Sequence, residues 1–189
     1  MVAQLPAAAH PRARRVRRVV LIGSESTGKT TLAARLAAHY GVEWVPEFVR
    51  DYVERKGEPL AVADQGPIAH GQIALEDAYR ARAIARAAPL LIQDTDLLST
   101  AVYCAHYYGA CPRWIDEAAR ARRPDLYLLL DVDIPWSPDP QRDRGDRRGE
   151  MQALFRDAVV RSGAAYRVIC GSDDDRLRSA IAAIEETER

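Results

Sequence analysis

The feature that most constrains this chain is a glycine-rich loop between a short apolar run and a helix-forming segment. The loop reads Gly-x-x-x-x-Gly-Lys-Thr from Gly23 to Thr30, which is the P-loop pattern in full. The glycines let the backbone wrap a phosphate without a Cβ in the way, and successive backbone N–H groups form a nest for an anion. A Gly/Ser turn that merely contains a lysine is the alternative, but the flanking strand and helix patterns favour the P-loop.

The loop predicts ATP as the ligand, with Mg²⁺ as its metal ion. Lys29 is expected to reach the β- and γ-phosphates, and the Thr30 hydroxyl to ligate Mg²⁺. The helix that begins at Gly28 points its positive end at the same place. The residues expected to contact the nucleotide are Gly23, Ser24, Glu25, Ser26, Thr27, Gly28, Lys29, Thr30 and Thr31 in the loop, together with Gly171 after the last strand.

Beyond the loop, apolar runs alternate with helical patterns along the whole chain. Strands are expected at residues 19–22, 42–45, 89–94, 125–131 and 166–170. Helices are expected at residues 28–40, 48–56, 67–88, 97–108, 113–122 and 151–162, and a last one follows a cap at Ser172 or Asp173. This alternation predicts an α/β fold of the P-loop NTPase type, with three layers and a mostly parallel five-stranded sheet. Residues 18–189 form its single domain.

Composition narrows the class of protein. The 27 basic and 27 acidic residues balance to a net charge of zero, so a nucleic-acid partner is not expected. No run of about 18 apolar residues is present, so a membrane partner is not expected either. Three cysteines without metal-ligand spacing indicate reduced thiols and a cytoplasmic protein. The basic residues 1–17 are interpreted as a flexible tail, with binding of an acidic partner as the alternative.

Acidic residues follow the strands at the edge where such sheets bind ligands. Asp94 closes an apolar strand, which is the position of the acid that helps to hold Mg²⁺ in P-loop enzymes. The alternative is that Asp94 caps the helix at residue 97, a role that Asp96 could fill equally well.

Glu47 follows the second strand and is a candidate general base for an attacking hydroxyl. Arg50 lies one helical turn later on the same face. A surface ion pair between Glu47 and Arg50 is the alternative, and such a pair would contribute little to stability.

Residues 136–148 contain four arginines and three aspartates. A loop of this length is uncommon in a compact domain unless it has a function. It is interpreted as a lid over the P-loop, with Arg142 contacting the phosphates. A hydrophilic connector is the alternative.

The long helix at 67–88 carries Gln72, which could read an amide or a base through paired hydrogen bonds. His70 is expected to pack or to face solvent. Four aromatic residues are candidates to stack on a flat ring, although most such residues belong to cores: Trp44, Tyr107, Tyr108 and Trp114.

Several short motifs occur together in order: the loop at 23–32, Glu47-x-x-Arg50-Asp51, His70-Gly-Gln72, Asp94-Thr-Asp96, Tyr108-Gly109 and Trp136-x-x-Asp139-Pro-x-Arg142. In this order they resemble the bacterial ribosylnicotinamide kinase domain, the C-terminal part of the bifunctional NAD-biosynthesis regulator. The resemblance covers about residues 18–185. No counterpart of the adenylyltransferase domain that precedes the kinase in that protein is expected in this chain.

The resemblance implies ATP-dependent phosphorylation of the 5′-hydroxyl of nicotinamide riboside, a small-molecule substrate. The catalytic candidates are Lys29, Glu47, Arg50 and Arg142, and the substrate-binding candidates are Glu47, Arg50, Gln72, Asp94, Asp96 and Tyr108. Two alternatives stay open at this point: a kinase for another nucleoside or nucleotide, and an ATP-binding regulatory module with little turnover.

Overall fold

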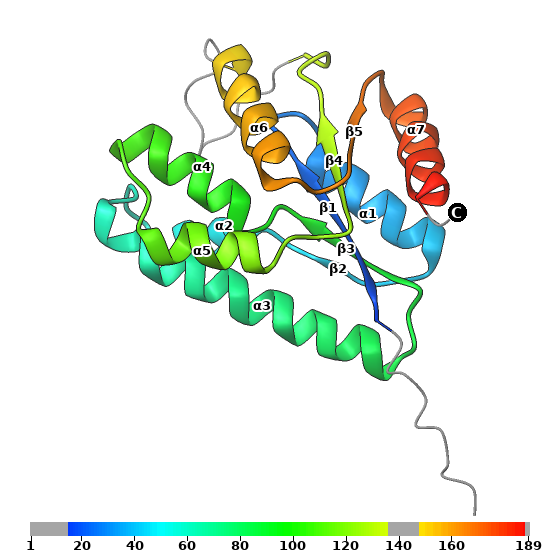
Figure 1. Ribbon diagram of the computed structural model, residues 1–189, viewed down its shortest axis with the longest axis horizontal. Helices are drawn as coiled ribbons and strands as arrows, with labels where there is room; N and C mark the ends of the chain where they lie inside the picture. The colour runs from blue at the N-terminus through cyan, green and yellow to red at the C-terminus, as the bar shows by residue number, and fades with distance from the viewer. Residues whose placement is uncertain (1–14, 136–147, 188–189) are drawn as a thin grey trace, which may run out of the picture.

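A computed structural model describes residues 15–135 and 148–187 of the 189-residue chain. Its centre is a sheet of five parallel strands in the order β2-β3-β1-β4-β5 (Figure 1). The strands are β1 (Arg17–Ile22), β2 (Trp44–Val45), β3 (Leu90–Asp94), β4 (Leu126–Leu130) and β5 (Tyr166–Ile169). The first strand in sequence is therefore the middle strand of the sheet.

Helices connect the strands and cover both faces of the sheet (Figure 1). They are α1 (Lys29–Tyr40), α2 (Phe48–Lys56), α3 (Gln65–Ala85), α4 (Leu97–Tyr108), α5 (Arg113–Ala121), α6 (Arg148–Ser162) and α7 (Asp173–Glu186), with a short 3₁₀ helix, η1, at Val62–Asp64. No helix in the part of the chain that the structure describes is both long and apolar enough to cross a bilayer.

The alternation of side chains along β1 divides the core into two layers. Val19 and Leu21 pack in a cluster with residues of α1 and α7. Val20 and Ile22 point to the opposite face and pack in a cluster with residues of α4 and α6. All four side chains are fully buried. A strand buried on both faces reads as a continuous apolar run, which is why the sequence pattern at 19–22 is uninterrupted.

The register of β1 and β3 brings the end of β1, where the P-loop begins, next to the end of β3, where Asp94 lies. Leu21 lies opposite Asp94, and the Thr95 N–H donates to the Leu21 carbonyl at 3.0 Å. Strand β1 ends at Ile22, and the P-loop begins at Gly23, two residues after Leu21. Asp94 is therefore held beside the start of the loop by the pairing of the strands.

The three-layer α/β fold with a parallel five-stranded sheet is confirmed, and the differences lie at the ends of elements. The second strand begins at Trp44 because the Val42 N–H is used to cap α1, donating to the Ala37 carbonyl at 3.0 Å. Helix α3 begins at Gln65, two residues before Pro67, because η1 leads directly into it. Helix α6 begins at Arg148, three residues before the expected start at Met151.

Candidate nucleotide and acceptor site

The P-loop runs from β1 to α1 and has the conformation that its glycines were expected to allow. Gly23 has a φ of 137°, and a Cβ at this position would lie 2.8 Å from the Leu130 carbonyl. Ser26 also has a positive φ, of 50°. Such left-handed residues turn successive N–H groups toward a common point, which is the geometry of an anion nest.

Lys29 is only 5% exposed and lies folded over the loop. Its Nζ donates to the Gly23 carbonyl at 3.1 Å and to the Ser24 carbonyl at 2.7 Å. The Thr27 hydroxyl donates to the same Ser24 carbonyl at 2.9 Å. The lysine charge is thus held at the mouth of the nest, where a phosphate could replace the carbonyl contacts.

Thr30 and Asp94 form the pair expected of a magnesium site. The Thr30 hydroxyl donates to Asp94 Oδ2 at 2.5 Å. Asp94 Oδ1 is buried and has no hydrogen-bond partner among the described residues. Burial, followed by repulsion from Glu47, raises the pKa of Asp94, while Lys29 and Thr30 act in the other direction. A buried carboxylate oxygen without a partner, beside a threonine hydroxyl, is a donor set that fits Mg²⁺.

Asp96 takes the capping role that the sequence had left open between two acids. Its Oδ1 accepts from the Leu98 N–H at 3.0 Å, at the start of α4. Its Oδ2 accepts from the Tyr127 hydroxyl at 2.7 Å, and burial raises its pKa. Asp96 is not among the described residues that line the cavity next to the P-loop. Its expected contact with the substrate stays a prediction.

Glu47 lies at the start of α2 and is 6% exposed. Arg50 Nε donates to Glu47 Oε2 at 3.0 Å, and the arginine side chain is 40% exposed. The ion pair exists, but one of its partners is a buried carboxylate that borders a cavity. The two interpretations from the sequence are therefore compatible, because an exposed arginine can orient a buried base.

A cavity of about 880 Å³ adjoins the P-loop and is bordered by residues of α2, α3 and α4. The expected substrate residues Glu47, Gln72 and Tyr108 contribute to its lining. Glu25 of the P-loop lines it as well and accepts from the Tyr107 hydroxyl at 3.3 Å. The cavity therefore reaches from the phosphate nest to the far end of α4, as an acceptor site would require.

The Gln72 amide is engaged on both sides. Its Oε1 accepts from the Phe48 N–H at 3.0 Å, and its Nε2 donates to Glu76 Oε1 at 3.2 Å. The Phe48 ring rests against Gly71, where a Cβ would come within 2.0 Å of it. The His-Gly-Gln motif thus holds the first residue of α2, next to Glu47. Direct recognition of a substrate amide by Gln72 stays a prediction.

The aromatic candidates divide into two groups. Tyr107 and Tyr108 line the cavity. Trp44 packs against the core cluster that contains α1, and Trp114 stacks on His70 with ring centroids 4.4 Å apart. Tyr103 also lines the cavity, stacked 6.0 Å from Tyr107. Its spacing of four residues from Tyr107 places both rings on one helix face, a signal available in the sequence.

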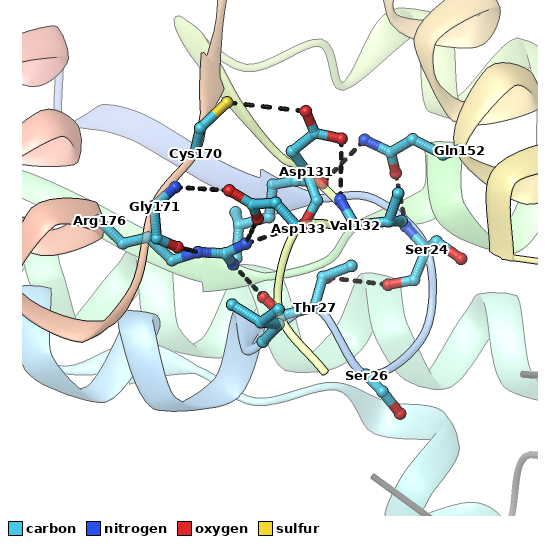
Figure 2. A network of polar contacts seen from close by, with 12 residues as sticks. Ser24, Ser26, Thr27, Asp131, Val132, Asp133, Gln152, Cys170, Gly171 and Arg176 are labelled. Atoms are coloured by element: carbon cyan, nitrogen blue, oxygen red, sulfur yellow. Dashed lines mark hydrogen bonds and ion pairs between the residues drawn. The ribbon is translucent and has the colours of Figure 1, made fainter. Parts of the chain in front are cut away.

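Two residues that the sequence analysis missed, Gln152 and Arg176, hold the P-loop from behind, together with Arg148, the last residue of the expected lid segment. Gln152 Oε1 accepts from the Ser24 N–H at 3.1 Å, and its Nε2 donates to the Leu130 carbonyl at 2.8 Å (Figure 2). Arg148 donates to the Ser26 carbonyl at 3.2 Å, and Arg176 is bonded to the loop as well. A polar residue in the apolar stripe of a helix is the signal for such contacts.

The other two nucleotide candidates lie outside the P-loop. The Gly171 N–H donates to Asp133 Oδ2 at 2.5 Å, which ties the end of β5 to the end of β4. Arg142 lies outside the described residues, as does the rest of the expected lid at 136–148 except Arg148, which begins α6. Both contacts with the nucleotide stay predictions.

A parallel sheet with a phosphate nest after its central strand, and with a threonine–aspartate pair beside that nest, defines a P-loop nucleotide-binding protein. A family model described as an AAA domain matches residues 18–176, and the chain belongs to this family.

Two curated relatives are similar to the chain. It is 29% identical over 178 residues to the trifunctional NAD biosynthesis/regulator protein NadR of Escherichia coli K12, which covers 90% of this chain and 42% of NadR. It is 32% identical over 146 residues to the NadR protein of Salmonella typhimurium LT2, which covers 74% of this chain and 35% of that relative. The chain thus spans less than half the length of either relative, and the resemblance to this regulator of NAD biosynthesis is confirmed as homology.

Solved structures show the same fold. A crystal structure of NadR in complex with NR has a TM-score of 0.73 at 24% identity, covering 93% of this chain and 52% of that one. A thymidylate kinase from Ehrlichia chaffeensis has a TM-score of 0.63 at 18% identity, covering 90% of this chain and 98% of that one. At these identities the likeness extends to the fold, and P-loop kinases share it.

Proposed function

We propose that the protein is an ATP-dependent kinase that phosphorylates the 5′-hydroxyl of nicotinamide riboside and produces nicotinamide mononucleotide. The observation that carries the proposal is the continuity of the phosphate nest with the 880 Å³ cavity, since Glu25 of the P-loop and Glu47 both line it. Homology to a regulator of NAD biosynthesis and the likeness to a NadR complex with NR support this choice of substrate.

In this proposal each group of the nest has a role in phosphoryl transfer, which depends mainly on positioning and on stabilisation of charge. Lys29 contacts the γ-phosphate and stabilises its charge during transfer, and Glu47 accepts the proton of the attacking 5′-hydroxyl. Arg50 orients Glu47. Thr30 and Asp94 would hold Mg²⁺, which neutralises phosphate charge when it is bound.

The charge of the cavity supports a cationic acceptor. Among the described residues that line it, the charged ones are all glutamates: Glu25, Glu47, Glu54 and Glu58. Nicotinamide riboside carries a positive pyridinium ring, whereas uridine, cytidine and thymidine are neutral. The tyrosine rings on α4 add faces on which a cationic ring binds favourably.

Two buried polar atoms of the lining support recognition of the carboxamide. Gln65 Nε2 and Ser99 Oγ have no hydrogen-bond partner among the described residues, and both side chains are at most 5% exposed. Buried polar groups are costly unless they find a partner. The carboxamide offers both an acceptor and a donor, so it could satisfy the two atoms. Gln65 and Ser99 are therefore added to the substrate residues expected from the sequence.

The lid at 136–148, with Arg142 on the phosphates, completes the proposed enzyme. The lid would exclude water from the transferring phosphoryl group. Use of ATP as the donor is consistent with a cytoplasmic enzyme.

The test is a set of parallel assays of ADP release with ATP, Mg²⁺ and one nucleoside at a time. Nicotinamide riboside is expected to give the highest kcat/KM, with uridine, cytidine and thymidine far below it. Turnover with another nucleoside but none with nicotinamide riboside would leave a kinase with a different substrate. Nucleotide binding without turnover of any nucleoside would favour a regulatory module.

A further inference from the structure

A buried arginine lies behind the P-loop, on a helix that the proposed reaction does not use. Arg176 belongs to the first turn of α7 and is 4% exposed. It occupies the buried face of the helix, one turn before Ala180. A buried guanidinium is destabilising unless its donors are paired, so its partners indicate why it is retained.

The partners of Arg176 come from three separate segments (Figure 2). Nη1 donates to the Thr27 carbonyl in the P-loop. Nε donates to the Gly171 carbonyl after β5 at 2.6 Å, and Nη2 donates to the Asp131 carbonyl after β4 at 2.9 Å. Nη2 also forms an ion pair with Asp133. One side chain thus joins the phosphate nest to the ends of two strands.

The contact with Thr27 has a direct consequence for the nest. A trans peptide is planar, and its C=O and N–H groups point in opposite directions. Because the Thr27 carbonyl is held toward Arg176, the N–H of the same peptide, which belongs to Gly28, points away from the guanidinium. Gly28 has a φ of 79°, and glycine rotates more freely than other residues. The peptide therefore depends on an external contact to keep its orientation.

Asp133 makes this contact rigid. Asp133 accepts a hydrogen bond from the Gly171 N–H at 2.5 Å and forms an ion pair with Arg176. Burial acts to raise the pKa of Asp133, but the Gly171 amide and Arg176 outweigh it, so the pKa lies below its usual value and the pair stays charged. A charged pair with several fixed hydrogen bonds holds the guanidinium in one place.

We propose that Arg176 is a positioning residue for the nucleotide phosphates. It holds the Thr27–Gly28 peptide so that the Gly28 N–H faces the nest, and it couples the nest to the loop after β5. The inference rests on the proposed use of ATP but not on the identity of the acceptor.

The test compares Arg176→Met, which removes all donors but keeps an unbranched apolar stem, with Arg176→Lys, which keeps the charge. Arg178→Met is the matched control, since Arg178 lies on the same helix with its side chain 72% exposed. Binding of the non-hydrolysable analogue AMP-PNP and of AMP is measured by calorimetry on the full chain. KM for ATP, KM for the nucleoside, kcat and Tm are measured alongside.

Arg176→Met is expected to weaken AMP-PNP binding by roughly 10- to 100-fold, the value of one charge-assisted hydrogen bond. AMP should be affected less than AMP-PNP, KM for ATP should rise, and KM for the nucleoside should change by less than about twofold. Arg176→Lys should fall between Arg176→Met and the wild type, and Arg178→Met should match the wild type.

Unchanged AMP-PNP affinity in either Arg176 variant would overturn the inference. Equal losses for AMP, AMP-PNP and the nucleoside, in step with a lower Tm, would overturn it as well by assigning Arg176 a general structural role. If Arg176→Met does not fold, Arg176→Lys decides by the same comparison of its loss of AMP-PNP affinity with its loss of AMP affinity. Weakened AMP-PNP binding in a protein that phosphorylates no tested nucleoside would support the inference while refuting the proposed function.

Discussion

The Thr30 hydroxyl donates to Asp94 Oδ2 at 2.5 Å and so joins the start of α1 to the end of β3. The other oxygen of Asp94 is buried without a partner among the described residues. Strand pairing fixes this arrangement, because Leu21 and Asp94 lie opposite each other in the register of β1 and β3. The nest and its acid are thus parts of one rigid unit.

Asp94→Asn is expected to weaken the Mg²⁺ dependence of activity much more than it weakens folding. The amide is nearly the same size and can still bond to Thr30, but it lacks the charge that a hard cation prefers. A titration of ADP release against Mg²⁺ should shift to higher concentration. Asp77→Asn, which removes an exposed acid on α3, serves as the control. An unchanged titration for Asp94→Asn would make Asp94 a purely structural residue.

Glu47→Gln is expected to lower kcat by about 10²- to 10⁴-fold, the usual contribution of a general base. AMP-PNP affinity should stay close to the wild-type value, because Glu47 lies on the acceptor side of the nest. Glu43→Gln is the matched control. Glu43 directly precedes β2, the strand that Glu47 follows, and it forms exposed ion pairs with Arg82 and Arg86. Wild-type kcat in Glu47→Gln would remove Glu47 from the chemistry and leave only its ion pair.

Gln65→Leu is expected to raise KM for nicotinamide riboside by up to about tenfold, the value of one neutral hydrogen bond, without changing KM for ATP. The riboside of unsubstituted pyridinium, which lacks the carboxamide, supplies the comparison. The variant should not discriminate against this analogue as the wild type does. Equal KM changes for both ribosides would mean that Gln65 shapes the cavity without reading the carboxamide.

Gly71→Ala is expected to displace α2, because the added Cβ would lie 2.0 Å from the Phe48 ring. The movement should carry Glu47 out of place, so kcat falls and KM for the nucleoside rises. Gly66→Ala on the same helix has open space around the new methyl group and should be neutral or stabilising, by roughly 0.5–1 kcal/mol. Identical kinetics and unfolding midpoints for the two variants would refute the proposed packing constraint.

Glu76 is expected to make stability depend on pH near neutrality. Burial and then repulsion from Asp96 raise its pKa to about 7, while Arg18, Arg122 and Gln72 act in the other direction. The folded state therefore binds this proton more tightly than the unfolded state. The stabilisation is complete below the unfolded pKa, near 4.5, and is lost as the pH rises through about 7.

The measurement is urea unfolding between pH 5 and pH 8. Wild-type stability should decrease over this range, and Glu76→Gln should show a smaller slope. Asp77→Asn also removes a partner of Arg122 but keeps the buried acid, so its slope should follow the wild type. Parallel slopes for Glu76→Gln and the wild type would show that Glu76 titrates normally.

The elements that the sequence predicted well are those defined by local signals. Helices α2 and α4 have the expected bounds, and each ends at a glycine in the left-handed conformation, Gly57 or Gly109. The P-loop is equally local, since its phosphate-binding groups are consecutive. Glu47 was expected beside the P-loop because the carboxyl ends of parallel strands meet at one edge, and it lines the cavity there together with Gln72 and Tyr108.

The parts that the sequence could not settle depend on distant partners. Asp94 and Asp96 are equivalent in pattern, and only the register with β1 and the hydroxyl of Tyr127 separate their roles. Gln152 and Arg176 bond to P-loop residues 128 and 149 positions away. A polar residue in an apolar stripe indicates that a buried contact exists, but its partner is decided by how helices α6 and α7 pack.

The position of β1 in the middle of the sheet has a consequence for the order in which the protein can assemble during synthesis. Its neighbours, β3 and β4, begin at Leu90 and Leu126. Strand β1 therefore leaves the ribosome long before either of the strands that pair with it. Arg176 is made later still. Until β3 and β4 are made, the nascent chain carries an unpaired strand with the apolar run Val19–Ile22, which is the kind of segment that chaperones bind and that aggregates when they do not.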